Sequence, residues 1–170
     1  MNFPKPGEYA EYYSDYIGHI PESKNIIEVL KDGRDRLQEL IKNIPMEKGD
    51  YAYGEGKWSV KEVLGHLADV ERVMTYRAMC IARGEKQSLP GFEQDDYVKT
   101  ASFNRRSLVS LADELLHLRN SSITLFKSFT EDDGLRWGKA NNNETTARAF
   151  MFIIAGHELH HMKILKERYL

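Results

Sequence analysis

Cysteine is almost absent from this chain of 170 residues, and its scarcity excludes several classes of protein. Cys80 is the only one, so no internal disulfide can form and cysteine-rich zinc sites are excluded. A reducing, cytoplasmic compartment fits this usage. The sequence also lacks an apolar run of the ~18 residues needed to cross a bilayer, and residues 1–16 lack the apolar centre of a signal peptide. We therefore expect no membrane partner.

A large charge of either sign is missing as well. The net charge is −2 at pH 7, so no basic balance points to nucleic acid and no acidic tail indicates a solvated arm. Repeats and low-complexity segments are also absent. The length suits one domain over residues 1–170, which is enough chain to bury roughly 70% of its unfolded surface.

Alternating apolar runs, which would indicate strands, are missing. The apolar residues recur instead at the spacing of a helix. Ser59 and Glu62 form a capping box, a typical start for a helix. Four helices are predicted, over residues 22–44, from 59 to about 82, from about 102 to 129, and from Thr145 or Thr146 to the end. Four helices of about 20 residues predict an all-α fold, a four-helix bundle.

Two segments lie outside these helices. Residues 1–20 are rich in proline, glycine and tyrosine, and we expect them to form an N-terminal arm that lies over the surface of the domain. Residues 84–101, which contain Pro90 and Gly91, form a long connection between the second and third helices. A connection of this length allows a crossover in place of a simple up-and-down order.

The most informative motif is His157-Glu158-Leu159-His160-His161, near the end of the last predicted helix. On a helix, His157 and His161 lie about 6 Å apart along the axis and ~40° apart around it. Two imidazoles at this spacing can bind one metal ion from the same helix face. His157 falls at the centre of the apolar stripe, so burial of both rings without a shared partner would cost several kcal/mol. A metal ion removes that cost.

The motif also matches the H-E-x-x-H pattern of zinc proteases, which need a third ligand, usually downstream. The one carboxylate downstream is Glu167, two turns or more from His157 and on a different face. A third ligand must then come from upstream, where the chain offers His19, His66 and His117. We favour His66, which lies on the shoulder of an apolar stripe on the second helix, a position expected to line a cleft. A partly exposed helical histidine fits this position equally well.

Three neutral histidines around a divalent ion leave one coordination position open. Zinc fits such a set best, and imidazole also suits nickel or iron. The open position can hold a water or a thiolate. Of the neighbouring residues, Glu158 is expected to be solvated, although it could act as a base, and His160 to lie at the rim of the site. Arg77, Tyr76 and Arg106 are candidate pocket residues.

A second apolar stripe runs along the back of the last predicted helix. A helix that is apolar on both sides is either central in the bundle or covered by another subunit. We predict a homodimer that uses this face. The stripe consists of Met151, Phe152, Ala155, Leu159 and Met162.

Several stretches together resemble the DinB/YfiT-like superfamily. The stretch Lys57–Leu67, followed by Asp69 and Glu71-Arg72, resembles its second-helix signature, and Ile153–His161 resembles its fourth-helix signature. Three stretches between them also match: Leu89–Phe92, Asp95–Tyr97 and Phe103–Ser107. The resemblance covers residue 20 to the end, and no ligand position departs from the pattern.

This resemblance implies an up-down-down-up bundle, commonly dimeric, in which one histidine of helix two and both ends of an H-x-x-x-H on helix four hold a metal. Carried over, these are His66, His157 and His161, and the protease match becomes incidental. Thiol-dependent S-transferases and a thiol-dependent isomerase are known in the family, and metal-dependent hydrolases have been proposed. Its name records induction after DNA damage and implies no polymerase activity.

The sequence therefore predicts a metal-dependent enzyme that acts on a small molecule, with a low-molecular-weight thiol or a water as the nucleophile. The cofactors expected are a divalent metal ion and, for the transferase type, the thiol. Two other hypotheses are a non-catalytic stress-response module that binds a metal or ligand, and a plain helix bundle whose histidines bind nothing.

Overall fold

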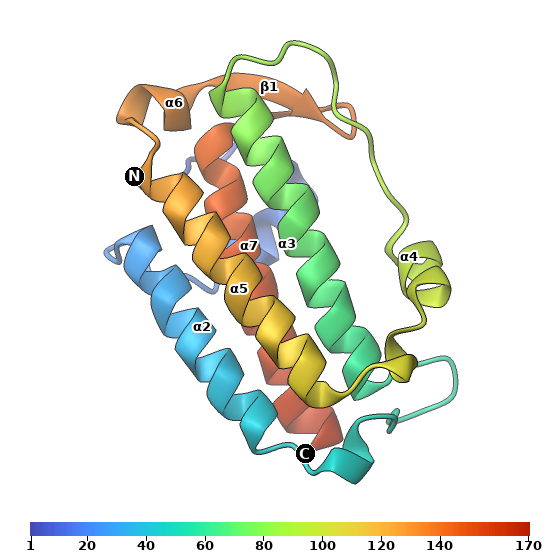
Figure 1. The fold of residues 1–170 in the computed structure, drawn as a ribbon. Coiled ribbons are helices and arrows are strands. Elements are labelled where there is room, and N and C mark those ends of the chain that lie inside the picture. Colours follow the sequence, from blue (N-terminus) through green and yellow to red (C-terminus); the bar gives the residue numbers. More distant parts are fainter.

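The computed structural model describes residues 1–170 and contains four long helices that pack as a bundle (Figure 1). They are α2 (Ile26–Lys42), α3 (Val60–Ala82), α5 (Leu108–Lys127) and α7 (Ala147–Ile164). The predicted all-α four-helix bundle is confirmed. The capping box is present, with the Ser59 hydroxyl accepting from the Glu62 backbone and the Glu62 side chain accepting from the Ser59 backbone. No helix is both long and apolar enough to span a bilayer.

The connection between α3 and α5 crosses over the length of the bundle, so these two helices run parallel (Figure 1). Its beginning lies at the C-terminal end of α3, where Leu89 pairs with Ala140. Its end lies at the N-terminal end of α3, where the Ser59 hydroxyl donates to the Asn104 side chain at 2.7 Å. This geometry matches the predicted crossover.

The crossover contains structure that the sequence analysis missed. Helix α4 (Gln94–Ala101) ends at Ser102, whose φ of 54° is left-handed and stops the helix. A 3-10 turn, η3 (Phe103–Arg105), follows, and Ser107 then caps α5. The predicted start of the third helix, near residue 102, was therefore six residues too early.

A short hairpin was also missed. Strands β1 (Trp137–Ala140) and β2 (Asn143–Thr146) pair antiparallel, with Ala140 opposite Asn143. The two residues between them, Asn141 and Asn142, have φ of 49° and 61°, which a two-residue type I′ turn requires and asparagine tolerates. A five-residue helix, α6 (Glu131–Leu135), precedes the hairpin.

The N-terminal arm packs more deeply than predicted. It forms η1 (Glu11–Tyr13) and α1 (Ser14–Ile17), and Ile17 and Ile20 are buried in the core. Gly156 allows this approach, since any Cβ there would collide with the Tyr16 carbonyl oxygen. The backbone of α1 thus lies directly on α7 next to the histidine motif.

Helix α7 is central in the bundle, and this corrects the predicted dimer interface. Four of the five residues on its back face are fully buried within the chain, and Leu159 is half-buried. They pack against the arm and α2 in two apolar clusters. This face is not free to meet a second subunit, so a homodimer would have to use another surface. The remaining elements are η2 (Met46–Lys48) and a π-helical turn at the end of α7, η4 (Leu165–Tyr169).

Candidate metal centre

The three predicted ligands converge at one point inside the bundle. His66 comes from α3, and His157 and His161 come from successive turns of α7. The Nε2 atoms of His66 and His157 are 3.0 Å apart, and the donor nitrogens of all three rings lie within 4.8 Å of one another. Their ring centroids are 4.5 to 5.0 Å apart. Helices α3 and α7 therefore place three imidazoles around a single position.

These nitrogens fit a divalent ion. Nitrogens bound to one zinc at about 2.0–2.1 Å with tetrahedral angles lie roughly 3.3 Å apart, which small side-chain movements would reach here. The Nδ1 atom of His161 is buried and has no hydrogen-bond partner, the one buried side-chain nitrogen or oxygen in this state. An orphaned buried donor or acceptor costs about 1–3 kcal/mol, and a ligand at this position removes that cost. No fourth His, Cys or carboxylate joins the set.

Burial keeps the three imidazoles neutral, which is the form that binds metal. His66 is 2% exposed, which corrects the expectation of a cleft position, and burial lowers its pKa to about 4. Burial, and then the nearby rings, lower the pKa of His161 to about 3 and that of His157 well below its usual value. The site therefore needs no deprotonation to accept a cation near neutral pH.

Aromatic side chains surround the triad. The Trp58 ring lies 4.7 Å from the His66 ring, and the Tyr16 ring meets His157 edge-on at 5.3 Å. His160 lies at the rim as predicted, 5.2 Å from both Tyr16 and His161. His19 stacks on His160 at 6.3 Å, outside the donor set, while His117 is exposed on α5. The sequence assigned neither Tyr16 nor Trp58 to the site, because Tyr16 belongs to the arm and Trp58 was only one residue of the second-helix signature.

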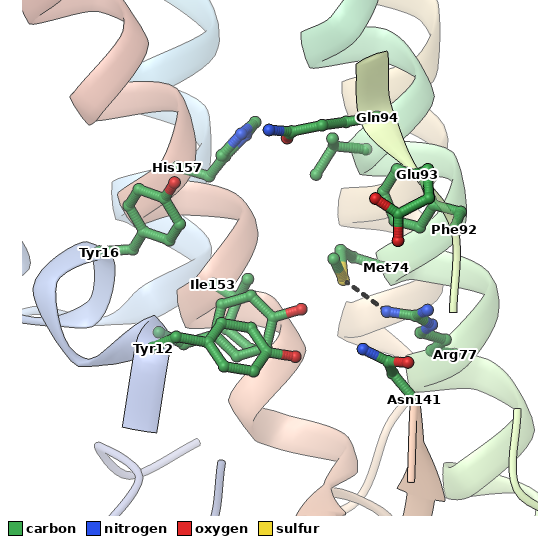
Figure 2. Close-up of a pocket in the computed structure, with 12 residues that line it drawn as sticks. Tyr12, Tyr16, Met74, Arg77, Phe92, Glu93, Gln94, Asn141, Ile153 and His157 are labelled. Atoms are coloured by element: carbon green, nitrogen blue, oxygen red, sulfur yellow. Dashed lines mark hydrogen bonds between the residues drawn. The ribbon is translucent and has the colours of Figure 1, made fainter. Parts of the chain in front are cut away.

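A pocket of about 380 Å³ reaches the triad through His157 (Figure 2). Tyr12, Tyr13 and Tyr16 of the arm form one wall, and Val70, Met74 and Arg77 of α3 form another. Figure 2 shows Gln94, the first residue of α4, pointing across the pocket towards His157. The arm and the crossover, which the sequence left without a role, thus complete the pocket.

Of the three candidate pocket residues, only Arg77 lines this pocket. Tyr76 is 53% exposed, and Arg106 pairs with Glu114 on α5. The expectation for Glu158 was wrong, because this residue is buried and its Oε2 lies 2.8 Å from Arg119 Nη2. Glu158 therefore anchors α7 rather than facing solvent as a base.

The sequence pattern of the DinB superfamily matches residues 30–165. This range spans most of the bundle and includes all three histidines of the triad. The chain belongs to the DinB superfamily.

Individual relatives agree with this DinB assignment. A "Putative metal-dependent hydrolase" of Oceanobacillus iheyensis is 23% identical over 78% of this chain and 76% of its own length. Another protein of that name, from Geobacillus thermodenitrificans, is 30% identical over 65% of this chain and 62% of its own length.

Solved structures share the fold. YfiT of Bacillus subtilis, described as "a probable metal-dependent hydrolase with an unusual four-helix bundle topology", superposes with a TM-score of 0.77 and 17% identity, over 96% of this chain and 89% of that one. A mycothiol-dependent maleylpyruvate isomerase superposes with a TM-score of 0.68 and 10% identity, over 86% of this chain and 61% of that one. At these identities the likeness concerns the fold.

We expect the metal-free protein to lose stability as the pH falls below about 6.5. The lowered pKa values mean that the unfolded chain takes up protons at a pH where the folded triad does not. The stability that depends on these neutral rings is fully present above pH 6.5, and it is lost as the pH falls towards 4 for His66 and towards 3 for His161. Each histidine accounts for on the order of 1 kcal/mol per pH unit.

Urea unfolding in chelator between pH 7.5 and 4.5 measures this slope. His66→Gln should flatten the profile, while the exposed control His117→Gln should leave it unchanged. Equal slopes for the two variants would contradict the prediction.

Proposed function

We propose that this DinB-superfamily protein is a metal-dependent enzyme in which His66, His157 and His161 hold one divalent ion. The observation that carries the proposal is the convergence of three neutral imidazoles, two buried and one partly buried with an orphaned nitrogen, at the end of a pocket. Zinc is our first choice and nickel or iron the next, because imidazole suits all three.

A divalent ion with three histidine ligands keeps a position open and lowers the pKa of a water or thiol that takes it. The chain's own residues supply the rest. The three rings are fixed by packing, with Trp58 against His66 and Tyr16 against His157. The arm and α4 border the pocket and limit the access of water. His157 lines the end of the pocket at which a small molecule would react.

We further propose that the reaction is attack by a thiol sulfur or a water oxygen on an electrophilic small molecule. Names of relatives support both types: two are called metal-dependent hydrolases, and the isomerase with the same fold depends on mycothiol. The single, half-buried cysteine fits the cytoplasmic compartment, where low-molecular-weight thiols are plentiful.

A non-catalytic metal module is the weaker alternative. Structural zinc sites are closed by a fourth protein ligand. Here only three residues, all histidines, can donate to the ion. The nearest carboxylate in sequence, Glu158, forms an ion pair with Arg119. An open position beside a pocket favours catalysis.

The test is metal binding followed by thiol binding. The purified protein should bind about one Zn²⁺ or Co²⁺ per chain, measured by elemental analysis and calorimetry. The cobalt form should show a thiolate-to-metal charge-transfer band when a small thiol such as mercaptoethanol is added. A protein that retains no ion after dialysis would end the proposal. A protein that holds the ion but responds to no thiol would support the hydrolase type.

A further inference from the structure

The far end of the pocket contains a buried charge that the proposed metal chemistry does not use. Arg77 of α3 is 3% exposed and lines the pocket. Its Nη2 donates to the Pro90 carbonyl at 2.6 Å, and its Nη1 lies 3.7 Å from the Met74 sulfur. Neither partner is charged. The guanidinium also lies over the Phe92 ring, 5.7 Å from its centroid, a contact that uses none of its donors. It carries five donors, so the two polar contacts do not use up its capacity.

The other buried arginines show what Arg77 lacks. Arg119 pairs with Glu71 and Glu158, and Arg148 pairs with Glu8. Arg77 is the one buried arginine that forms no ion pair with a carboxylate. A buried charge without a counter-ion is costly, and a bound anion would remove that cost through charge-assisted hydrogen bonds.

Neighbouring groups suit an anion at this end. Asn141, at the turn of the hairpin, and Tyr13, on the arm, line the pocket together with Arg77 and can donate hydrogen bonds. Figure 2 shows the Asn141 amide close to Arg77 at the end of the pocket opposite His157. Glu93 is the one carboxylate in the lining; it is exposed and forms no ion pair with Arg77.

The distance between the two ends sets the shape of the ligand. His66 and Arg77 are eleven positions apart on α3, a rise of roughly 16 Å. The Arg77 side chain turns back towards Met74, about one turn nearer, which leaves roughly 10 Å between guanidinium and triad. The apolar stretch between them is lined by Val70, Met74 and Ile153.

We propose that Arg77 is the anchor for the anionic tail of an elongated small molecule whose reactive end lies at the histidine triad. The inference rests on the proposed function and adds the substrate class: a carboxylate, or a similar anion, separated by a mostly apolar spacer from a thiol or an electrophilic carbon. Arg77 is thus a specificity residue rather than a catalytic one.

Matched probes test the proposal on the cobalt-loaded protein. Mercaptocarboxylic acids with about four to eight methylenes bracket the span, and mercaptoalcohols of equal length are the neutral partners. We expect the acids to bind about 10- to 100-fold more tightly than the alcohols, the effect of a hydrogen bond to a charged group. A second series replaces the thiol with a hydroxamate, which stands in for the carbonyl of an electrophile, and carries the same carboxylate or alcohol at the other end. A preference confined to thiols assigns the anion to the thiol, and one confined to hydroxamates assigns it to the electrophile.

Variants then locate the preference. Arg77→Met should abolish it while metal content stays at one per chain, and Arg77→Lys should keep part of it. Arg83→Met, which removes an equal charge from the exposed end of the same helix, should change nothing. Glu93→Gln should strengthen the binding of the acids.

Equal binding of acids and alcohols to the wild-type protein overturns the inference without any variant, so poor folding of Arg77→Met cannot hide the answer. If the protein holds metal and binds both probes alike, the anion site fails and the proposed function stands. If it holds no metal, both fail.

Discussion

Replacing His157 with alanine is expected to lower the affinity for a divalent ion by more than about 100-fold. Loss of residues that merely support metal ligands costs 10- to 100-fold, and loss of a ligand removes more. His157 contributes an Nε2 that lies 3.0 Å from Nε2 of His66, and its ring centroid lies 4.5 Å from that of His161. Two nitrogens from separate helices would remain, too few for a firm site.

Calorimetric titration with Zn²⁺ measures the loss, and the thermal shift on adding metal provides a second readout. Zinc should raise the melting temperature of the wild type, since an ion bound only by the folded state stabilises it. It should leave the melting temperature of His157→Ala unchanged. The matched control is His117→Ala, an exposed histidine on α5. A variant that keeps one zinc per chain at wild-type affinity would show that His157 is not a ligand.

The same triad shows how far sequence reasoning reaches. The spacing of His157 and His161 fixes their common face once the segment is helical. The place of His66 beside the apolar stripe of α3 left a partly exposed histidine equally open, and only the burial of its ring in the structure decides between the two. The capping box fixes the start of α3. These are local rules, and the structure agrees with each of them. The family assignment, confirmed over residues 30–165, supports the same arrangement.

Features that depend on tertiary contact escaped the sequence. Glu158 looks solvated on a helical wheel, yet Arg119, 39 positions earlier, neutralises it inside the core. Gly33 and Gly156 carry no signal of their own, although one makes room for Glu158 and the other for the backbone of α1. The arm could be predicted to lie on the domain, but not to form a wall of the pocket.

A second large effect is expected at Arg119, where all four helices of the bundle meet. Arg119 of α5 is 3% exposed and donates to Glu71 of α3 at 2.8 and 2.9 Å. It also lies 2.8 Å from Glu158 of α7 and donates to the Leu30 carbonyl of α2 at 3.2 Å. One guanidinium thus satisfies two buried carboxylates and ties the turn of α7 that carries His157 to the other helices.

Arg119→Met should lower the free energy of unfolding by about 3–5 kcal/mol, because it leaves two buried carboxylates without a counter-ion. Urea unfolding at pH 7.5 measures the loss. Arg72→Met, which removes solvent-exposed ion pairs to Asp69 of α3 and Glu114 of α5, is the control and should cost less than about 1 kcal/mol. Adding Glu71→Gln and Glu158→Gln to Arg119→Met should restore part of the stability, since the unpaired charges disappear.

The deficit of Arg119→Met should also depend on pH. Burial raises the pKa of Glu158 despite the opposing effect of Arg119. Without the guanidinium that pKa rises further, so the deficit of Arg119→Met should shrink as the pH falls and the carboxyl takes up a proton. If Arg119→Met costs no more than Arg72→Met, the buried charges do not hold the helices together, and the position of His157 must depend on apolar packing alone.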